Sequence, residues 1–415
     1  MELSDSDLDV EAVASSSQTF RTSQMPHTSS SHLSLFSPSL PWPKKIVGTD
    51  RTDRTDRTDR TTLLEQYYVD FKEFKYMFVR KCMVWKKYEA YKVWAQWLIR
   101  NLCHVTHNYH IMPPDHAIDN DNDIITHLQE KGLETQQITS FYQQIKQYVS
   151  QLYQQYHRAK VDQMTHVEQM IQTDQKITCE TIVHNGKEVC IYRYGTVFIK
   201  YNRDVRDLLV HRYTGDPKCL RFCLFEMGFN YYMLDGHSFQ WCLPPKAFGT
   251  LEKMLAIKTE FFASPMNACL PRYYSLFHVD RLFGAIDNFF NLDVSTILEG
   301  IYEMNPPFIE QIFVESSKMV VDMLQRSQQL KKDLMFVYVM PNWIDSGGYQ
   351  QLVHSGYLVD ELVLENKKHF YYQSVKHRLI AANFETHILV VGTSIARSRW
   401  DTGVKSRFMD QLSHY

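Results

Sequence analysis

Asn305-Pro306-Pro307-Phe308 is the run of residues best suited to chemistry by type and spacing. The exocyclic amine of an adenine is a poor nucleophile, because its lone pair is delocalised into the ring. Acceptors bound to both amine hydrogens draw the nitrogen toward a tetrahedral geometry, and the Asn305 side-chain oxygen and the Pro306 carbonyl are two such acceptors. The prolines stiffen the loop, and Phe308 offers a face for stacking. The run predicts activation of an adenine amine, with a plain turn as the alternative.

The elements around this run predict a site at the edge of a sheet. Ile301 to Met304 has the pattern of a strand and Ile309 to Gln325 that of a helix. A strand, a rigid loop and a helix in that order place the loop at the carboxyl edge of a parallel sheet. Further strands are predicted at Phe261-Phe262, Leu334 to Val339 and His387 to Val391. Their alternation with helices indicates an α/β domain with a largely parallel sheet.

A second loop lies about 40 residues before the first. Phe261-Phe262 is followed by Ala263-Ser264-Pro265-Met266-Asn267, a run of small and turn-forming residues. The loop after a first strand is where nucleotide-like cofactors dock in doubly wound sheets. No Gly-x-Gly-x-x-Gly accompanies it, so the residue types alone indicate the place of a cofactor and not its identity.

Four short runs in this order resemble the cap-specific adenosine N6-methyltransferases, also called the phosphorylated-CTD-interacting-factor family. The resemblance extends over about residues 175 to 400. The runs that carry it are Glu260 to Asn267, Asp280-Arg281-Leu282-Phe283-Gly284, Asn305 to Phe308 and Met340-Pro341-Asn342-Trp343.

The resemblance implies a Rossmann-like, S-adenosylmethionine-dependent methyltransferase that acts on the first transcribed adenosine of capped RNA. It assigns catalysis to Asn305, Pro306, Pro307 and Phe308. Phe308 and Trp343 are implied as substrate-binding residues. The residues implied around S-adenosylmethionine are Ala263, Ser264, Pro265, Asn267, Phe283, Gly284 and Asp293.

Two other functions stay open at this stage. The first is a catalytically silent RNA-binding or transcription-complex module, which would be free to lose Asn305. The second is the same chemistry on DNA or on internal RNA adenines. Cellular family members carry an N-terminal WW domain that reads the tail of RNA polymerase II. No paired-tryptophan pattern precedes residue 63, where Trp42 stands alone among prolines. We therefore expect the chain to lack the WW domain and its polymerase-tail contact.

Composition divides the 415 residues into four parts. Residues 1–62 are rich in Ser and in a Thr-Asp-Arg repeat, which predicts a disordered tail. Aromatic residues at helical spacing predict a helical module over 63–172. The Asn185-Gly186 pair between two apolar runs predicts a hairpin at the start of a methyltransferase core over 173–401. Residues 402–415 are expected to be a loose tail.

The formal net charge of −2 excludes a globally basic nucleic-acid binder, so any RNA surface must be local. Lysines and arginines between Lys72 and Arg100 outnumber acidic residues there, which is typical of a solvated helix face or of an RNA-backbone contact. Cys103, His104, His107 and His110 lie close together, but no second ligand pair follows, and we expect no metal. No apolar run is long enough for a bilayer and no leader is evident. We expect a protein of the nucleus, or of the cytoplasm if a virus encodes it.

Overall fold

The computed structural model describes residues 57–82, 94–95, 97–98, 125, 128–129, 134–159, 166–234, 240–374 and 378–413. Most of the predicted disordered tail and the Cys103–His110 cluster lie outside these residues. The chain forms two compact units. One comprises Thr28–Gly236 with Phe277–Gly284, and the other contains His237–Leu276 and Ala285–Tyr415. The first unit therefore crosses the boundary at residue 173 that composition predicts.

The unit that contains residues 28–236 begins with helices held together by aromatic rings. Phe74 of α1 stacks on Tyr148 of α4 with ring centroids 5.0 Å apart. Five buried residues recur at intervals of three or four along α4, which places them on one stripe of the helix: Ile138, Phe141, Ile145, Tyr148 and Leu152. The helices of this unit are α1 (Arg57–Cys82), α4 (Thr135–Ala159), α5 (His166–Asp174), α6 (Arg203–Arg212), η3 (Pro217–Cys219), α7 (Leu220–Leu234) and η5 (His278–Phe283).

Lys75 departs from the solvated face that the sequence suggests. Its side chain is buried, its Nζ donates to the carbonyl oxygen of Tyr232, and it lies 4.8 Å from the centroid of the Tyr232 ring. Lysine is nearly always solvated unless it finds such partners. This lysine therefore supports packing within the unit.

A three-stranded antiparallel sheet completes the same unit, with strands β1 (Thr178–His184), β2 (Lys187–Tyr194) and β3 (Val197–Asn202). The predicted turn at Asn185-Gly186 is confirmed. Both residues have positive φ, 49° and 73°. A two-residue hairpin turn of this hand requires such angles, which Asn and Gly adopt most readily.

The second unit is built on a six-stranded sheet in the order β6-β5-β7-β8-β12-β9. Four neighbouring strands are parallel, whereas β12 runs antiparallel to both β8 and β9. The prediction of a largely parallel sheet is thus confirmed except at β12. The strands are β5 (Thr259–Glu260), β6 (Arg272–Tyr273), β7 (Gly300–Met304), β8 (Leu334–Pro341), β9 (Leu358–Leu364) and β12 (Thr386–Gly392).

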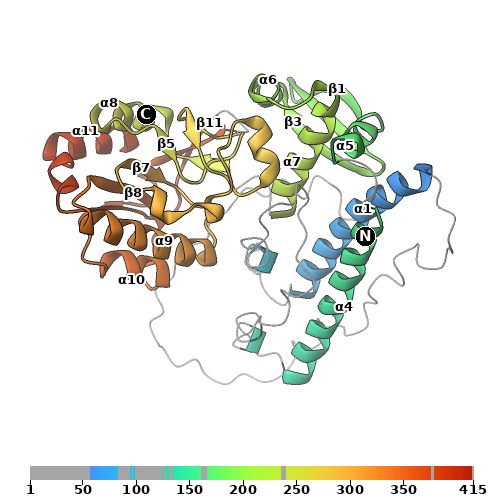
Figure 1. Ribbon diagram of the computed structural model, residues 1–415, viewed down its shortest axis with the longest axis horizontal. Coiled ribbons are helices and arrows are strands. Elements are labelled where there is room, and N and C mark those ends of the chain that lie inside the picture. The colour runs from blue at the N-terminus through green and yellow to red at the C-terminus, as the bar shows by residue number, and fades with distance from the viewer. Residues whose placement is uncertain are drawn as a thin grey trace. The chain divides into compact units, whose positions relative to one another are not determined.

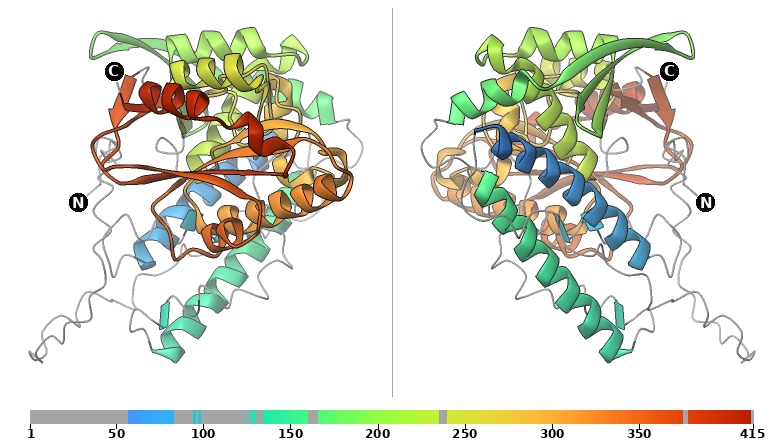
Figure 2. Two further views of the ribbon diagram at one scale, coloured as in Figure 1. Left: turned by 90° about the vertical axis from the view of Figure 1, so that its left-hand side faces the viewer. Right: turned by 90° about the vertical axis from the view of Figure 1, so that its right-hand side faces the viewer.

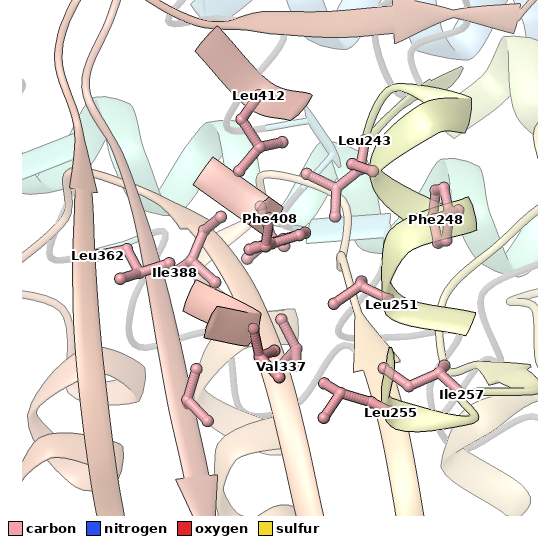
Figure 3. Packing of buried hydrophobic residues seen from close by; sticks show 14 of the residues in the cluster. Leu243, Phe248, Leu251, Leu255, Ile257, Val337, Leu362, Ile388, Phe408 and Leu412 are labelled. Carbon is pink, nitrogen blue, oxygen red and sulfur yellow. The ribbon is translucent and has the colours of Figure 1, made fainter. Parts of the chain in front are cut away.

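Helices cover both faces of this sheet (Figures 1 and 2), with α8 and α11 on one face and α9 and α10 on the other. Figure 3 shows Leu251 of α8 and Phe408 of α11 pointing into the same apolar layer as Val337 of β8 and Ile388 of β12. The helices are α8 (Pro245–Leu255), η6 (Phe289–Asn291), η7 (Val294–Thr296), α9 (Glu310–Gln329), α10 (Gly347–Val353), η9 (Ala396–Arg399) and α11 (Thr402–Ser413). A smaller sheet pairs β4 (Trp241–Cys242), β10 (Phe370–Gln373) and β11 (Arg378–Ala381).

The expectation of a loose C-terminal tail is wrong for residues 402–413. They form α11, in which Val404, Phe408 and Leu412 are buried. These residues recur at intervals of four, which places them on one stripe of a helix. Because polar residues lie between them, the composition of this segment does not indicate such a short apolar stripe.

Phe408→Ala tests this packing. Removing a fully buried phenylalanine side chain from the core leaves a cavity, so we expect the free energy of unfolding to fall by about 3–5 kcal/mol. Chemical denaturation of the purified protein measures it, with the exposed Arg407→Ala as the control on the same helix. Equal stability of the two variants would show that α11 contributes little to the core.

Candidate functional site

Three loops leave the same edge of the six-stranded sheet. Glu260 of β5 pairs with Glu303 of β7, and Met304 of β7 pairs with Tyr338 of β8, all in parallel register. Parallel strands in register end together, so the loops that follow β5, β7 and β8 share the carboxyl edge. The structure therefore brings Ala263–Asn267, Asn305–Phe308 and Trp343 to one edge, as the sequence predicts.

The order of the strands also defines a crevice at this edge. The chain passes from β5 outward to β6 and then returns to the other side of β5 to form β7. Backbone bonds from Ile286 N to Tyr273 O and from Ser275 N to Asp287 O extend the sheet beyond β6. The strand order reverses between β5 and β7, and open α/β sheets bind their ligands at such a point.

Asn305 occupies the end of β7 with its side chain largely buried, at 9% exposure. Its amide Nδ2 is buried and has no hydrogen-bond partner among the described residues. A buried polar nitrogen without a partner is costly in a folded protein. This amide is therefore available to a ligand that supplies the missing partner.

The two prolines give this loop its shape. Pro306 is buried and Pro307 half-buried, and each has a fixed φ and no N–H to satisfy. The carbonyl oxygen of Pro307 accepts from Ile309 N at 2.6 Å, directly before α9 begins at Glu310. Asn305 and Phe308 are thus held on a short rigid loop between a strand and a helix.

Phe308 is half-buried in a wall of aromatic rings. Its centroid lies 6.4 Å from Trp343 and 5.7 Å from Phe384, at steep interplanar angles. Phe384 in turn lies parallel to Trp241, with centroids 6.3 Å apart. Such edge-to-face contacts fix the rings in place. The predicted neighbours Phe308 and Trp343 do lie together, and Trp241 and Phe384 are additions from distant parts of the chain.

A series of side-chain hydrogen bonds adjoins these aromatic rings. His369 Nδ1 donates to the carbonyl oxygen of Glu365 at 2.9 Å, so the neutral ring accepts from Thr386 Oγ1 at Nε2 over 2.8 Å. Thr386 Oγ1 then accepts from the Tyr371 hydroxyl at 2.9 Å. Burial lowers the pKa of His369 and keeps it neutral. These hydrogen bonds fix Tyr371, whose ring centroid lies 6.0 Å from that of Phe308.

The loop after β5 is closed by its own side chains. Ser264 N donates to Asn267 Oδ1 at 2.6 Å, and Met266 N donates to Ser264 Oγ at 3.1 Å. Ser264 Oγ also donates to Oε1 of Gln240, a residue that the motifs do not include. Ala263, Ser264, Pro265 and Asn267 are all buried. The predicted cofactor loop is therefore a preformed turn.

Strand β5 ends earlier than predicted, at Glu260 rather than at Phe262. Phe261 N still donates to Glu303 O, and Ala263 N donates to Tyr274 O, both at 2.9 Å. The extended backbone thus continues past the strand, and its hydrogen bonds alternate between the segments on either side, as in any central strand of a sheet.

Two buried carboxyl groups face each other beneath the two loops. Glu260 Oε1 accepts the backbone N–H groups of Cys269 and Leu270. Neither oxygen of Glu303 has a hydrogen-bond partner among the described residues. Burial, followed by the negative charge of Glu260 and the Cys269 thiol, raises the pKa of Glu303 well above its usual value. The buried site thus favours the uncharged form of Glu303.

The other three predicted cofactor residues lie outside the loop after β5. Phe283 and Gly284 belong to the other compact unit, where Phe283 packs 5.3 Å from Tyr213 and Gly284 ends η5 with a φ of 100°. Asp293 caps η7 by accepting from Ser295 N, and this bond, with a smaller effect of Arg326, lowers its pKa. Arg326 is in the last turn of α9, whereas Asn305–Phe308 precedes the first turn. Asp293 therefore lies near the last turn of α9.

Within the described residues, no group of three His, Cys, Asp or Glu side chains is placed to hold a metal ion. The same residues include no helix that is long and apolar enough to cross a membrane.

Comparison with known proteins relates this region to methyltransferases. The family model described as "Phosphorylated CTD interacting factor 1 WW domain" matches residues 210–374. The mouse and human proteins named mRNA (2'-O-methyladenosine-N(6)-)-methyltransferase are 28% and 27% identical over 210 residues. The match covers 47% of this chain and 29% of each relative, so the chain spans less than a third of the relatives it matches. The chain is thus similar to adenosine N6-methyltransferases.

The match corrects one expectation. We expected the chain to lack a WW domain, whereas the matching family model carries that name. The expectation relied on paired tryptophans before residue 63, but the match extends over residues 210–374. In the structure this range includes strands β5, β7 and β8 and the loop Asn305–Phe308.

Replacing Glu303 tests the buried acid. Because its pKa is raised in the folded state, the folded protein retains a proton that the unfolded chain has lost above the ordinary glutamate value, so stability falls as pH rises from there. Glu303→Gln cannot ionise. We expect its Tm to exceed that of the wild type at about pH 8 and to approach it near about pH 4.

Thermal unfolding between these pH values measures the effect. The exposed Glu299→Gln, just before β7, should follow the wild-type profile. A Glu303→Gln variant with an unchanged pH profile would contradict a raised pKa at this position.

Proposed function

We propose that this chain transfers a methyl group from S-adenosylmethionine to N6 of an adenine. The observation that carries the proposal is the Asn305 side chain, whose buried Nδ2 has no partner among the described residues. It lies beside the half-buried Phe308, on a rigid loop at the switch point of the sheet. The similarity to adenosine N6-methyltransferases over this region supports it.

The sheet is consistent with the Rossmann-like methyltransferase fold that the sequence predicts. Four parallel strands, one antiparallel strand inserted beside β9, and helices on both faces fit such a domain. We propose that the crevice between the loops after β5 and β7 is the cofactor site, because dinucleotides and related ligands bind at this point of open α/β sheets.

The residues present fit S-adenosylmethionine. The cofactor carries acceptor atoms along its length, and beside the loop after β5 a buried side-chain amide nitrogen has no hydrogen-bond partner among the described residues. Ala263, Ser264, Pro265 and Asn267 would hold it on the β5 side. When bound, S-adenosylmethionine supplies the electrophilic methyl group.

The residues of the chain orient the acceptor. Phe308 provides a π face for the adenine, and its ring neighbours keep that face fixed. The Asn305 side-chain oxygen and the Pro306 carbonyl would accept from the two amine hydrogens, so that the lone pair is directed and its conjugation with the ring is weakened. Asn305 Nδ2 would then donate to the neighbouring ring nitrogen of the adenine. Burial raises the pKa of Glu303, so its uncharged form is favoured beneath the loop. The proton that the methylated amine releases would leave to solvent.

Asn305→Ala tests the chemistry. Loss of a preorganised hydrogen bond to the reacting amine should lower kcat by a factor on the order of a hundred or more. The Tm and the affinity for S-adenosylmethionine should stay near the wild-type values. Methyl transfer to RNA, followed by mass spectrometry of nucleosides, gives the rate, and Asn342→Ala, whose amide binds Glu385, is the matched asparagine control. Near-wild-type turnover by Asn305→Ala would overturn the mechanism.

We further propose that the substrate is the first transcribed adenosine of a capped RNA. The names of the relatives support this choice. A terminal adenine needs little unstacking to enter a pocket, and a second contact on the cap would raise its local concentration at Phe308.

Cap dependence is directly measurable. We expect capped RNA that begins with adenosine to be methylated at least about tenfold faster than the uncapped RNA, given the gain from a second anchor. The comparison includes capped RNA that begins with guanosine, and DNA with internal adenines. Equal methylation of internal adenines would refute the cap assignment and leave the N6 chemistry standing.

A further inference from the structure

We propose that Gln240 is a cofactor-binding residue, whose side-chain amide holds Ser264 on one side and donates a hydrogen bond to an acceptor atom of S-adenosylmethionine on the other. The inference rests on the proposed function and adds to it a residue outside every motif that the sequence offers.

Gln240 is buried, but only one of its two side-chain polar atoms has a hydrogen-bond partner among the described residues. Its side chain is 2% exposed. Oε1 accepts from Ser264 Oγ, whereas Nε2 is buried with no hydrogen-bond partner among the described residues. Free energy is lost when the two N–H donors of a buried amide have no acceptors. A ligand acceptor in the crevice removes that cost.

The position of Gln240 is fixed from several sides. Its carbonyl oxygen accepts from Ser374 Oγ at 3.3 Å. Ser264, to which it is bonded, is tied through its backbone N and its hydroxyl to Asn267. The unpartnered nitrogen therefore sits beside the loop after β5, where the proposed cofactor site lies. A residue fixed in this way can orient a ligand without an entropic penalty at binding.

Trp241, the residue after Gln240, belongs to the aromatic rings on the proposed substrate side. Trp241 begins β4, and its ring lies parallel to Phe384 in the aromatic wall that includes Phe308. Gln240 directly precedes this strand. Gln240 and Trp241 thus connect the cofactor loop with the substrate wall through one peptide unit.

Two substitutions separate the two roles of Gln240. Gln240→Glu keeps an acceptor for Ser264 Oγ but removes the donor, and Gln240→Met removes both while keeping the side-chain length. Isothermal titration of the full chain with S-adenosylmethionine should give a Kd raised about tenfold or more for both variants. In steady-state assays the KM for S-adenosylmethionine should rise, while the KM for RNA stays unchanged.

Gln373→Met is the matched control. Gln373 is also buried and lies opposite Trp241 in β10, but its Oε1 accepts from Arg378 Nε. We expect this variant to keep the wild-type Kd for S-adenosylmethionine. Titration with 5'-methylthioadenosine, which lacks the amino-acid carboxylate, distinguishes the acceptor. An equal loss of affinity for both ligands assigns it to the nucleoside, and a loss for S-adenosylmethionine alone assigns it to the carboxylate.

Two results would overturn the inference. If Gln240→Glu and Gln240→Met bind S-adenosylmethionine as tightly as the wild type, Gln240 is not a cofactor residue, and the proposed function stands. A lower Tm with an unchanged Kd has the same meaning, because it shows a structural role only. A wild-type protein that does not bind S-adenosylmethionine overturns the inference and the proposed function together.

Discussion

Strands β5, β7 and β8 pair in parallel and in a fixed register, and the candidate site depends on that register. Glu260 lies opposite Glu303, so the two loops that follow leave the sheet side by side. A shift of one residue would turn Asn305 to the other face of the sheet, because side chains alternate along a strand. The apolar layers on both faces, filled by α8 and α11 on one side and by α9 on the other, make any such shift costly.

Burial at this edge sets the electrostatics of the site. Glu260 and Glu303 approach each other where water is excluded, and two negative charges in that position would repel strongly. The backbone N–H groups of Cys269 and Leu270 bind Glu260, and burial beside Glu260 raises the pKa of Glu303. The raised pKa favours the uncharged form of Glu303 beneath the loop.

Part of this architecture can be predicted from local patterns. The hairpin at Asn185-Gly186 follows from the φ angles that those residues adopt, and β7, β8 and α9 follow from apolar periodicity. Helix α11 is not predicted, because its buried apolar stripe consists of only Val404, Phe408 and Leu412. The antiparallel direction of β12 escapes it as well, because a buried strand has the same apolar composition in either direction.

The sequence by itself determined the loop Asn305–Phe308, its place between a strand and a helix, and the turn-forming loop Ala263–Asn267. The chemistry of these residues is local, since it depends on an amide, two proline rings and a stacking face that are adjacent in the chain. Only the tertiary structure decided that Gln240 accepts a hydrogen bond from Ser264. It also decided that Trp241 and Phe384 extend the aromatic wall, and that Asp293 lies near the last turn of α9. Those relations join segments up to about 140 residues apart, and no local pattern records which distant side chains the packing of strands and helices brings into contact.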